Sequence, residues 1–178
     1  YGFSWITGNW DMWSYNVGQN MYLYRPAGGR WVLMPWDIDF TFGLGNTATS
    51  QLWGGQDPVI NRMYNNVTFR RMLWRVYLEA ANGPLLATNF QPQIDARRSV
   101  LQRNAIPGLS SPSSITTFIN QRRTYLLQQI NANQAPRFEI TSNAGANYTS
   151  ATPTAQLRGT APFAVAAVAV NGIPYPLT

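Results

Sequence analysis

The segment from Asn9 to Gly43 constrains this chain more than any other part of it. It places three of the seven acidic residues, Asp11, Asp37 and Asp39, among tryptophan and phenylalanine side chains. An ionised carboxylate beside apolar surface is costly unless a cation or strong hydrogen-bond donors meet it. The cluster therefore predicts a divalent-metal or phosphate-transfer site. The alternative, for each single Asp, is a turn cap at a strand end.

The same segment predicts a β-hairpin. Residues 21–24 and 31–34 are rich in aromatic and aliphatic side chains, and the turn sequence Pro-Ala-Gly-Gly lies between them at 26–29. The run Trp-Asp-Ile-Asp-Phe follows the second strand. If this run is extended, its two carboxylates lie on one face, because successive side chains of a strand alternate.

The composition excludes several kinds of active site. All thirteen basic residues are Arg, and the 178 residues contain no Lys, His or Cys. A Ser-His-Asp triad, a cysteine nucleophile, an ordinary zinc site and a Schiff-base lysine are therefore excluded within this chain. Carboxylate chemistry remains, either metal-assisted or of the glycosidase kind.

Charge and hydropathy also limit the partners. The formal net charge is +6, but the Arg residues are scattered along helical stretches without a basic run. This pattern favours solvated helix faces over nucleic-acid binding. No apolar run approaches the roughly 20 residues of a membrane span. The chain begins without an initiator Met or a signal peptide, so we expect it to be part of a longer protein.

Beyond the Gly- and Asn-rich stretch at 43–55 the pattern becomes helical. A helix capped by Thr68 should end at the Asn-Gly-Pro sequence 82–84, and further helices are expected from about Pro92 to Asn104 and after Ser113 and Ser114. After residue 134 short strand patterns return. We therefore predict an α+β fold: a mostly helical domain at 1–134, and at 135–178 the beginning of a β-sandwich of the immunoglobulin kind, truncated at its end.

The order of the acidic residues is that of a kinase site. Protein kinases use a catalytic Asp, an Asn five residues later and then a metal-binding Asp. Asp11 and Asn16 have this interval, and Asp37 follows the hairpin. An EF-hand starting at Asp37 fails, because Phe42 occupies the position that requires Gly. A glycosidase pair stays possible, because sequence does not give the distance between carboxylates.

These residues also carry a family resemblance. Asn-Trp-Asp at 9–11, Asn16, Gly-Arg-Trp at 29–31 and above all Pro-Trp-Asp-Ile-Asp at 35–39 resemble the spore coat protein H (CotH) kinase family. The helical region around Phe69 and the sequence Phe-Ile-x-x-Arg at 118–122 are also similar to it. The resemblance covers about residues 8–131.

The resemblance implies the mostly helical C-terminal lobe of an atypical protein kinase, with the hairpin carrying the active-site motif. It implies Asp11 as the catalytic base, and Asn16 and Asp37 as ligands of the Mg²⁺ or Mn²⁺ that accompanies ATP, with Asp39 as an alternate metal ligand. Trp36 and Phe40 would form a dry wall around the phosphates. The implied acceptor is a Ser- or Thr-containing surface or coat protein, and the implied location is secreted or on the surface of a bacterial cell.

The chain departs from the family in one respect. A kinase needs a cover over the phosphates and a basic residue that pairs with them. These residues contain no Lys, so we expect the nucleotide-gripping N-terminal lobe to lie elsewhere in the same protein and this part alone to be inactive. The competing hypothesis is a non-catalytic structural or adhesive surface protein whose aspartates bind Ca²⁺ or only hold turns.

Overall fold

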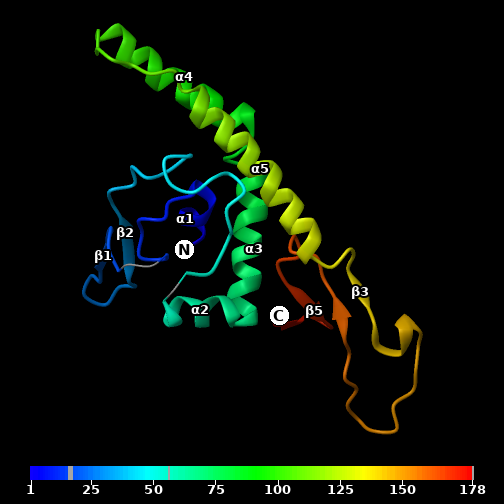
Figure 1. Ribbon diagram of the computed structural model, residues 1–178. Helices are drawn as coiled ribbons and strands as arrows, with labels where there is room; N and C mark the ends of the chain where they lie inside the picture. Colours follow the sequence, from blue (N-terminus) through cyan, green and yellow to red (C-terminus); the bar gives the residue numbers. More distant parts are fainter. Residues whose placement is uncertain (16–17, 56, 178) are drawn as a thin grey trace.

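The computed structural model describes residues 1–15, 18–55 and 57–177, and it combines helices with small antiparallel strand pairs (Figure 1). The predicted α+β class is therefore confirmed at this level. The helices are α1 (Gly2–Thr7), α2 (Pro58–Asn65), α3 (Val67–Ala81), α4 (Ala87–Arg103), α5 (Ser113–Asn133) and the short 3₁₀ helix η1 (Ser142–Gly145). The strands are β1 (Met21–Tyr24), β2 (Val32–Pro35), β3 (Glu139–Ile140), β4 (Gly159–Thr160), β5 (Val168–Val170) and β6 (Ile173–Tyr175).

The predicted hairpin is confirmed, with its second strand one residue later than expected. β1 and β2 pair antiparallel, with Tyr22 opposite Met34 and Leu23 opposite Leu33. Gly28 in the connecting turn has φ 70°, a conformation that glycine adopts without strain. All residues of both strands except the half-buried Met21 are exposed, so this sheet lies at the surface.

The helix starts differ from the prediction. Asn66, not Thr68, caps α3: its side chain accepts hydrogen bonds from the backbone N–H groups of Thr68 and Phe69. α4 begins at Ala87 and contains Pro92, which was expected to start it. Pro92 lies beyond the first turn, so it removes the hydrogen bond that a backbone N–H at this position would donate to the Thr88 carbonyl, and α4 continues through it.

Two helices were missed. α2 follows Asp57, whose carboxylate caps it, and begins with Pro58. This Asp-Pro pair is itself a helix-start signal. α1 is a short helix in a region for which no helix was predicted, and its residues Trp5 and Ile6 are buried in the core.

The core lies between α1, α3 and α5. Its large buried side chains include Trp5 of α1, Trp74 and Tyr77 of α3, and Leu126 and Ile130 of α5. They recur along α3 and α5 at helical spacing, as the apolar pattern predicted. α4, all of whose residues are described, buries no side chain and projects from the other helices (Figure 1).

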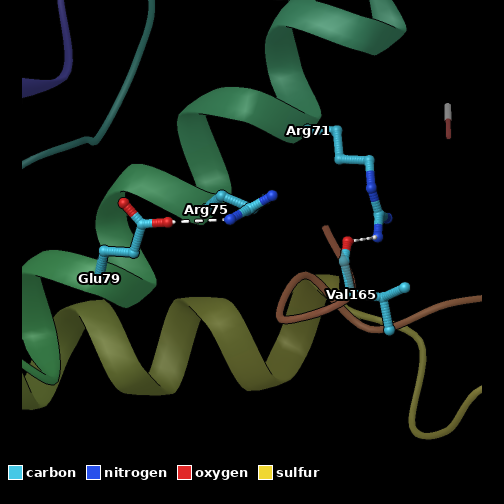
Figure 2. Close-up of polar contacts among 4 residues, drawn as sticks. All are labelled: Arg71, Arg75, Glu79 and Val165. Atoms are coloured by element: carbon cyan, nitrogen blue, oxygen red, sulfur yellow. Dashed lines mark hydrogen bonds and ion pairs between the residues drawn. The ribbon is translucent and has the colours of Figure 1, made fainter. Parts of the chain in front are cut away.

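The C-terminal segment packs against the helices through Phe163. This side chain joins the core and stacks on Trp74 with ring centroids 5.6 Å apart. Arg71 of α3 donates hydrogen bonds to the carbonyl oxygens of Pro162 at 2.8 Å and Val165 at 3.1 Å. Figure 2 shows the bond to Val165 beside the exposed Arg75–Glu79 ion pair one turn along α3.

The strands of this C-terminal segment form separate two-stranded sheets, β3 with β4 and β5 with β6. The sequence from Phe163 through Gly172 was expected to form short strands. Residues 168–170 do so as β5, whereas residues 162–165 form the turn that Arg71 holds. The β-sandwich and the boundary after residue 134 stay predictions. In the part of the chain that the structure describes, no helix has both the length and the apolar character needed to cross a bilayer.

Candidate functional site

Asp11 lies in the loop that leaves α1. Gly8 ends the helix with φ 72°, and Asn9, whose side chain is buried, accepts a hydrogen bond from the Asp11 backbone N–H at 2.8 Å. This is the short-range turn that Asn side chains favour. The position of Asp11 therefore follows from the end of α1 and from a buried amide.

Two amide side chains hold the Asp11 carboxylate. Asn20 donates to Oδ2 at 3.0 Å and also to the Asp11 carbonyl at 2.6 Å, and Gln19 donates to Oδ1. Both donors are neutral, so they orient the carboxylate without neutralising its charge. Neither Gln19 nor Asn20 was singled out from the sequence.

Asn20 also connects Asp11 to the Trp-Asp-Ile-Asp motif. It immediately precedes β1, and its carbonyl accepts a hydrogen bond from the Trp36 N–H at 3.1 Å. Trp36 is the residue before Asp37. One buried residue thus binds the Asp11 side chain through its amide and the start of the motif through its backbone. The hairpin register makes this possible, since Asn20 continues β1 opposite the end of β2.

The motif is a turn and not an extended strand. Asp37 has φ 50° and Phe42 has φ 53°, both in the left-handed region. The expectation that Asp37 and Asp39 share a face by strand alternation is therefore wrong, since one left-handed residue interrupts the alternation. No described residue donates a hydrogen bond to the Asp37 carboxylate, and this side chain is exposed.

Asp39 has a local role in the same turn. Its Oδ1 accepts a hydrogen bond from the Phe40 N–H at 3.0 Å, and its carbonyl accepts one from the Thr41 N–H at 2.8 Å. The Thr41 hydroxyl in turn donates to the Ile38 carbonyl at 3.0 Å. The Asp39 carboxylate therefore caps a turn, as the alternative to a metal ligand predicts. The Asp37 carboxylate does not.

Backbone hydrogen bonds hold the loop at residues 36–51, called the motif loop from here on, against the end of α1. The Phe42 N–H donates a hydrogen bond to the Thr7 carbonyl at 2.8 Å, and the Asn46 N–H donates one to the Gly8 carbonyl at 3.0 Å. A Cβ at Gly45 would lie 2.5 Å from Trp10 Cδ1, so only glycine permits this approach. The loop that carries Asp11 and the loop that carries the motif are therefore neighbours.

The aromatic residues of the motif are partly exposed. Trp10 packs against Phe40 with centroids 5.3 Å apart, and Trp36 stacks on Tyr22 at 5.8 Å. Trp36 is 48% exposed and Phe40 is 37% exposed. The dry wall that was expected of these two residues is thus open to water in this structure.

Arg122 anchors the far end of the motif loop. This residue of α5 is 1% exposed, and its guanidinium donates to the carbonyls of Ala48 at 2.9 Å, Ser50 at 2.6 Å and Gln51 at 3.3 Å, and to Trp5 of α1. Burial lowers its pKa to about 10, so it stays charged at neutral pH. From the sequence, Arg122 was part of the family resemblance and was also one of the helical Arg residues expected on a solvated face. For Arg122 that second expectation is wrong, because the residue is buried.

The predicted site is therefore resolved in part. Asp11 and the motif lie on neighbouring loops joined by Asn20, whereas Asn16 lies outside the described residues. Within residues 1–15, 18–55 and 57–177, no three acidic side chains gather into a metal-ligand cluster. A carboxylate ligand from Asp37, with Asp39 as the alternate, suits Mg²⁺, which usually takes one or two carboxylates together with substrate phosphates.

Comparison with known protein families matches the family described as CotH kinase protein over residues 3–126. The match covers well over half of the chain. The chain belongs to the CotH kinase family. No curated protein and no solved structure matches it.

The CotH match places the site inside the family domain. It extends from α1 to Leu126 in α5 and so includes Asp11, the hairpin, the motif and Arg122. The segment that follows α5 lies outside it. The resemblance drawn from the sequence is thereby confirmed, and the roles of the individual site residues stay predictions.

Proposed function

We propose that this chain supplies the acceptor half of a kinase active site, which transfers phosphate from ATP to Ser or Thr hydroxyls of a surface or coat protein. The observation that carries the proposal is the link through Asn20, which ties the Asp11 carboxylate to the start of the motif in a CotH domain. Asp11, aimed by two neutral amides, suits a base that accepts the hydroxyl proton.

Asp37 is the principal candidate for the metal ligand. Its carboxylate is exposed and receives no hydrogen bond from the described residues, whereas the Asp39 carboxylate is engaged by the turn. A bound Mg²⁺ would neutralise charge on the phosphates. Asn16 completes the expected ligand set. Mn²⁺ has the same oxygen preference.

The rest of the site belongs to other parts of the protein. Phosphate binding in kinases requires a Lys and a covering loop, and this chain has no Lys. We propose that an N-terminal lobe provides both and that these 178 residues alone transfer no phosphate. The spore-coat or cell-surface setting and a β-sandwich after residue 134 belong to the same proposal.

We expect Asp37→Asn to weaken binding of Mg²⁺·ATP to the intact protein by about 10- to 100-fold, because a charge-assisted contact contributes about 1.5 to 3 kcal/mol. Isothermal titration calorimetry of the intact protein measures this affinity. Asp95→Asn is the matched control, since Asp95 is exposed on α4 and bonds only to Gln91 of its own helix. Unchanged Mg²⁺·ATP affinity in Asp37→Asn would contradict the metal assignment.

If ATP does not bind and Ca²⁺ alone stabilises the protein, the non-catalytic hypothesis is correct.

A further inference from the structure

An open groove of about 950 Å³ begins at the motif and continues along α4 and α5. One wall is the motif loop, including Asp39 and Phe42, and the other comes from α4 and from the first half of α5. Its volume is at the upper end of the roughly 300 to 1,000 Å³ of ligand sites. It has room for a segment of polypeptide, well beyond what a single ion needs.

The groove has an apolar floor. Phe118 of α5 is buried beneath it and meets Phe42 edge to face, with centroids 6.1 Å apart. Leu101 of α4 is 42% exposed on the opposite wall. An occupant would therefore bury at least one apolar side chain between α4 and the motif loop.

The α4 wall also carries two positive charges, Arg97 and Arg98. Arg98 donates a hydrogen bond to the Ser110 carbonyl, and this bond fixes its guanidinium against the loop between α4 and α5. Within the described part of the chain, Arg97 donates hydrogen bonds only inside α4, to the carbonyl and the side chain of Gln93 at 3.3 and 3.2 Å. Among the described residues, neither forms a salt bridge with a carboxylate. The wall is therefore complementary to an acidic side chain.

We infer that the groove binds an extended acidic segment of the acceptor protein. An apolar side chain of the segment packs on Phe118 and Leu101, and an acidic side chain binds Arg97 and Arg98. Where the segment continues along the motif loop, its hydroxyl residue lies at the Asp39 end, beside the motif. This last step rests on the proposed function, whereas binding of the acidic segment does not.

The test is peptide binding to this chain without nucleotide, followed by fluorescence anisotropy. Two labelled nine-residue peptides each contain one Ser and one Leu and differ only in carrying two Glu or two Lys. We expect the Glu peptide to bind, the Lys peptide not to bind, and Arg97→Glu to weaken binding about tenfold or more. Arg103→Glu makes the same charge change on α4 outside the groove and should have no effect.

A second pair of variants tests the apolar contact. Leu101→Ser should weaken binding of the Glu peptide, whereas Val100→Ser, at an exposed neighbouring position outside the groove, should not. Circular dichroism shows that the variants keep their helices. Equal binding of both peptides, or equal effects of Arg97→Glu and Arg103→Glu, would overturn the inference. A third result would also overturn it: the chain forms a dimer that dissociates in Leu101→Ser but does not dissociate when the Glu peptide is added. The groove would then be the binding site of a second copy of this chain.

The two proposals fail separately. Asp37 does not line the groove, so Asp37→Asn should leave peptide binding unchanged. Peptide binding in a protein that does not bind Mg²⁺·ATP would contradict the proposed function alone. Mg²⁺·ATP binding without peptide binding would contradict the groove alone.

Discussion

Replacing Arg122 with Met should lower the free energy of unfolding by about 3 kcal/mol or more. Met is unbranched and reaches about as far as the Arg Nε, so the substitution removes the charge and the hydrogen bonds while keeping the volume of the aliphatic part. Four carbonyls, those of Trp5, Ala48, Ser50 and Gln51, lose this donor, and Trp5 and Ala48 are buried residues. An unsatisfied buried polar group costs about 1 to 3 kcal/mol, and relaxation recovers only part of this.

One effect opposes this loss. Burial lowers the pKa of Arg122 to about 10, because the charged guanidinium is less well solvated in the folded protein than in the unfolded chain. Removing the charge therefore removes a desolvation penalty. Since the guanidinium is the common partner of α1 and the loop at 48–51, we expect the lost hydrogen bonds to outweigh it.

The neighbouring Arg123 supplies the control. It also lies in α5, but its side chain makes a single hydrogen bond to the residues that the structure describes, from Nε to the Ala81 carbonyl at 2.7 Å. Arg123→Met should lower the free energy of unfolding by only about 1 kcal/mol. Urea denaturation followed by circular dichroism measures both variants. Equal losses for the two variants would show that Arg122 does not hold the motif loop in place.

Asp11→Asn should reduce phosphate transfer by the intact protein about 10²- to 10⁴-fold, the usual contribution of a positioned general base. Asn has nearly the same shape as Asp and can keep one hydrogen bond to the amides of Gln19 and Asn20. It cannot accept the hydroxyl proton. The loss should therefore appear in kcat, while the affinity for Mg²⁺·ATP changes much less.

The assay follows transfer of labelled γ-phosphate to Ser-containing peptides, with Asp95→Asn again as the control. Asn20→Ala provides a further test, because Asn20 positions Asp11 without touching the reacting atoms. Its effect should be smaller and should also fall on kcat. Full activity of Asp11→Asn would exclude Asp11 as the base.

Local sequence patterns predicted much of this fold. The Pro-Ala-Gly-Gly turn gave the hairpin, and apolar side chains at helical spacing gave α3 and α5, because both signals arise from residues close in sequence. The family was also identified from short motifs.

The contacts that position the site could not be predicted in the same way. Asn20 meets Asp11 nine residues away, and Arg122 meets Trp5 across 117 residues. Such contacts depend on packing between elements. The left-handed backbone at Asp37 was missed for a related reason, since only the surrounding hydrogen bonds select it over extended backbone.

The most direct test of the central claim locates the metal. Mn²⁺ with ATP is added to the intact, ¹⁵N-labelled protein, and the broadening of amide signals near the paramagnetic ion is measured. We expect the signals of Asp11, Asn20 and Asp37 to broaden only when ATP and Mn²⁺ are both present, and those of Asp57 and Asp95 to stay sharp. Broadening centred on Asp57 or Asp95, or equal broadening without ATP, would contradict a phosphate-transfer site at the motif.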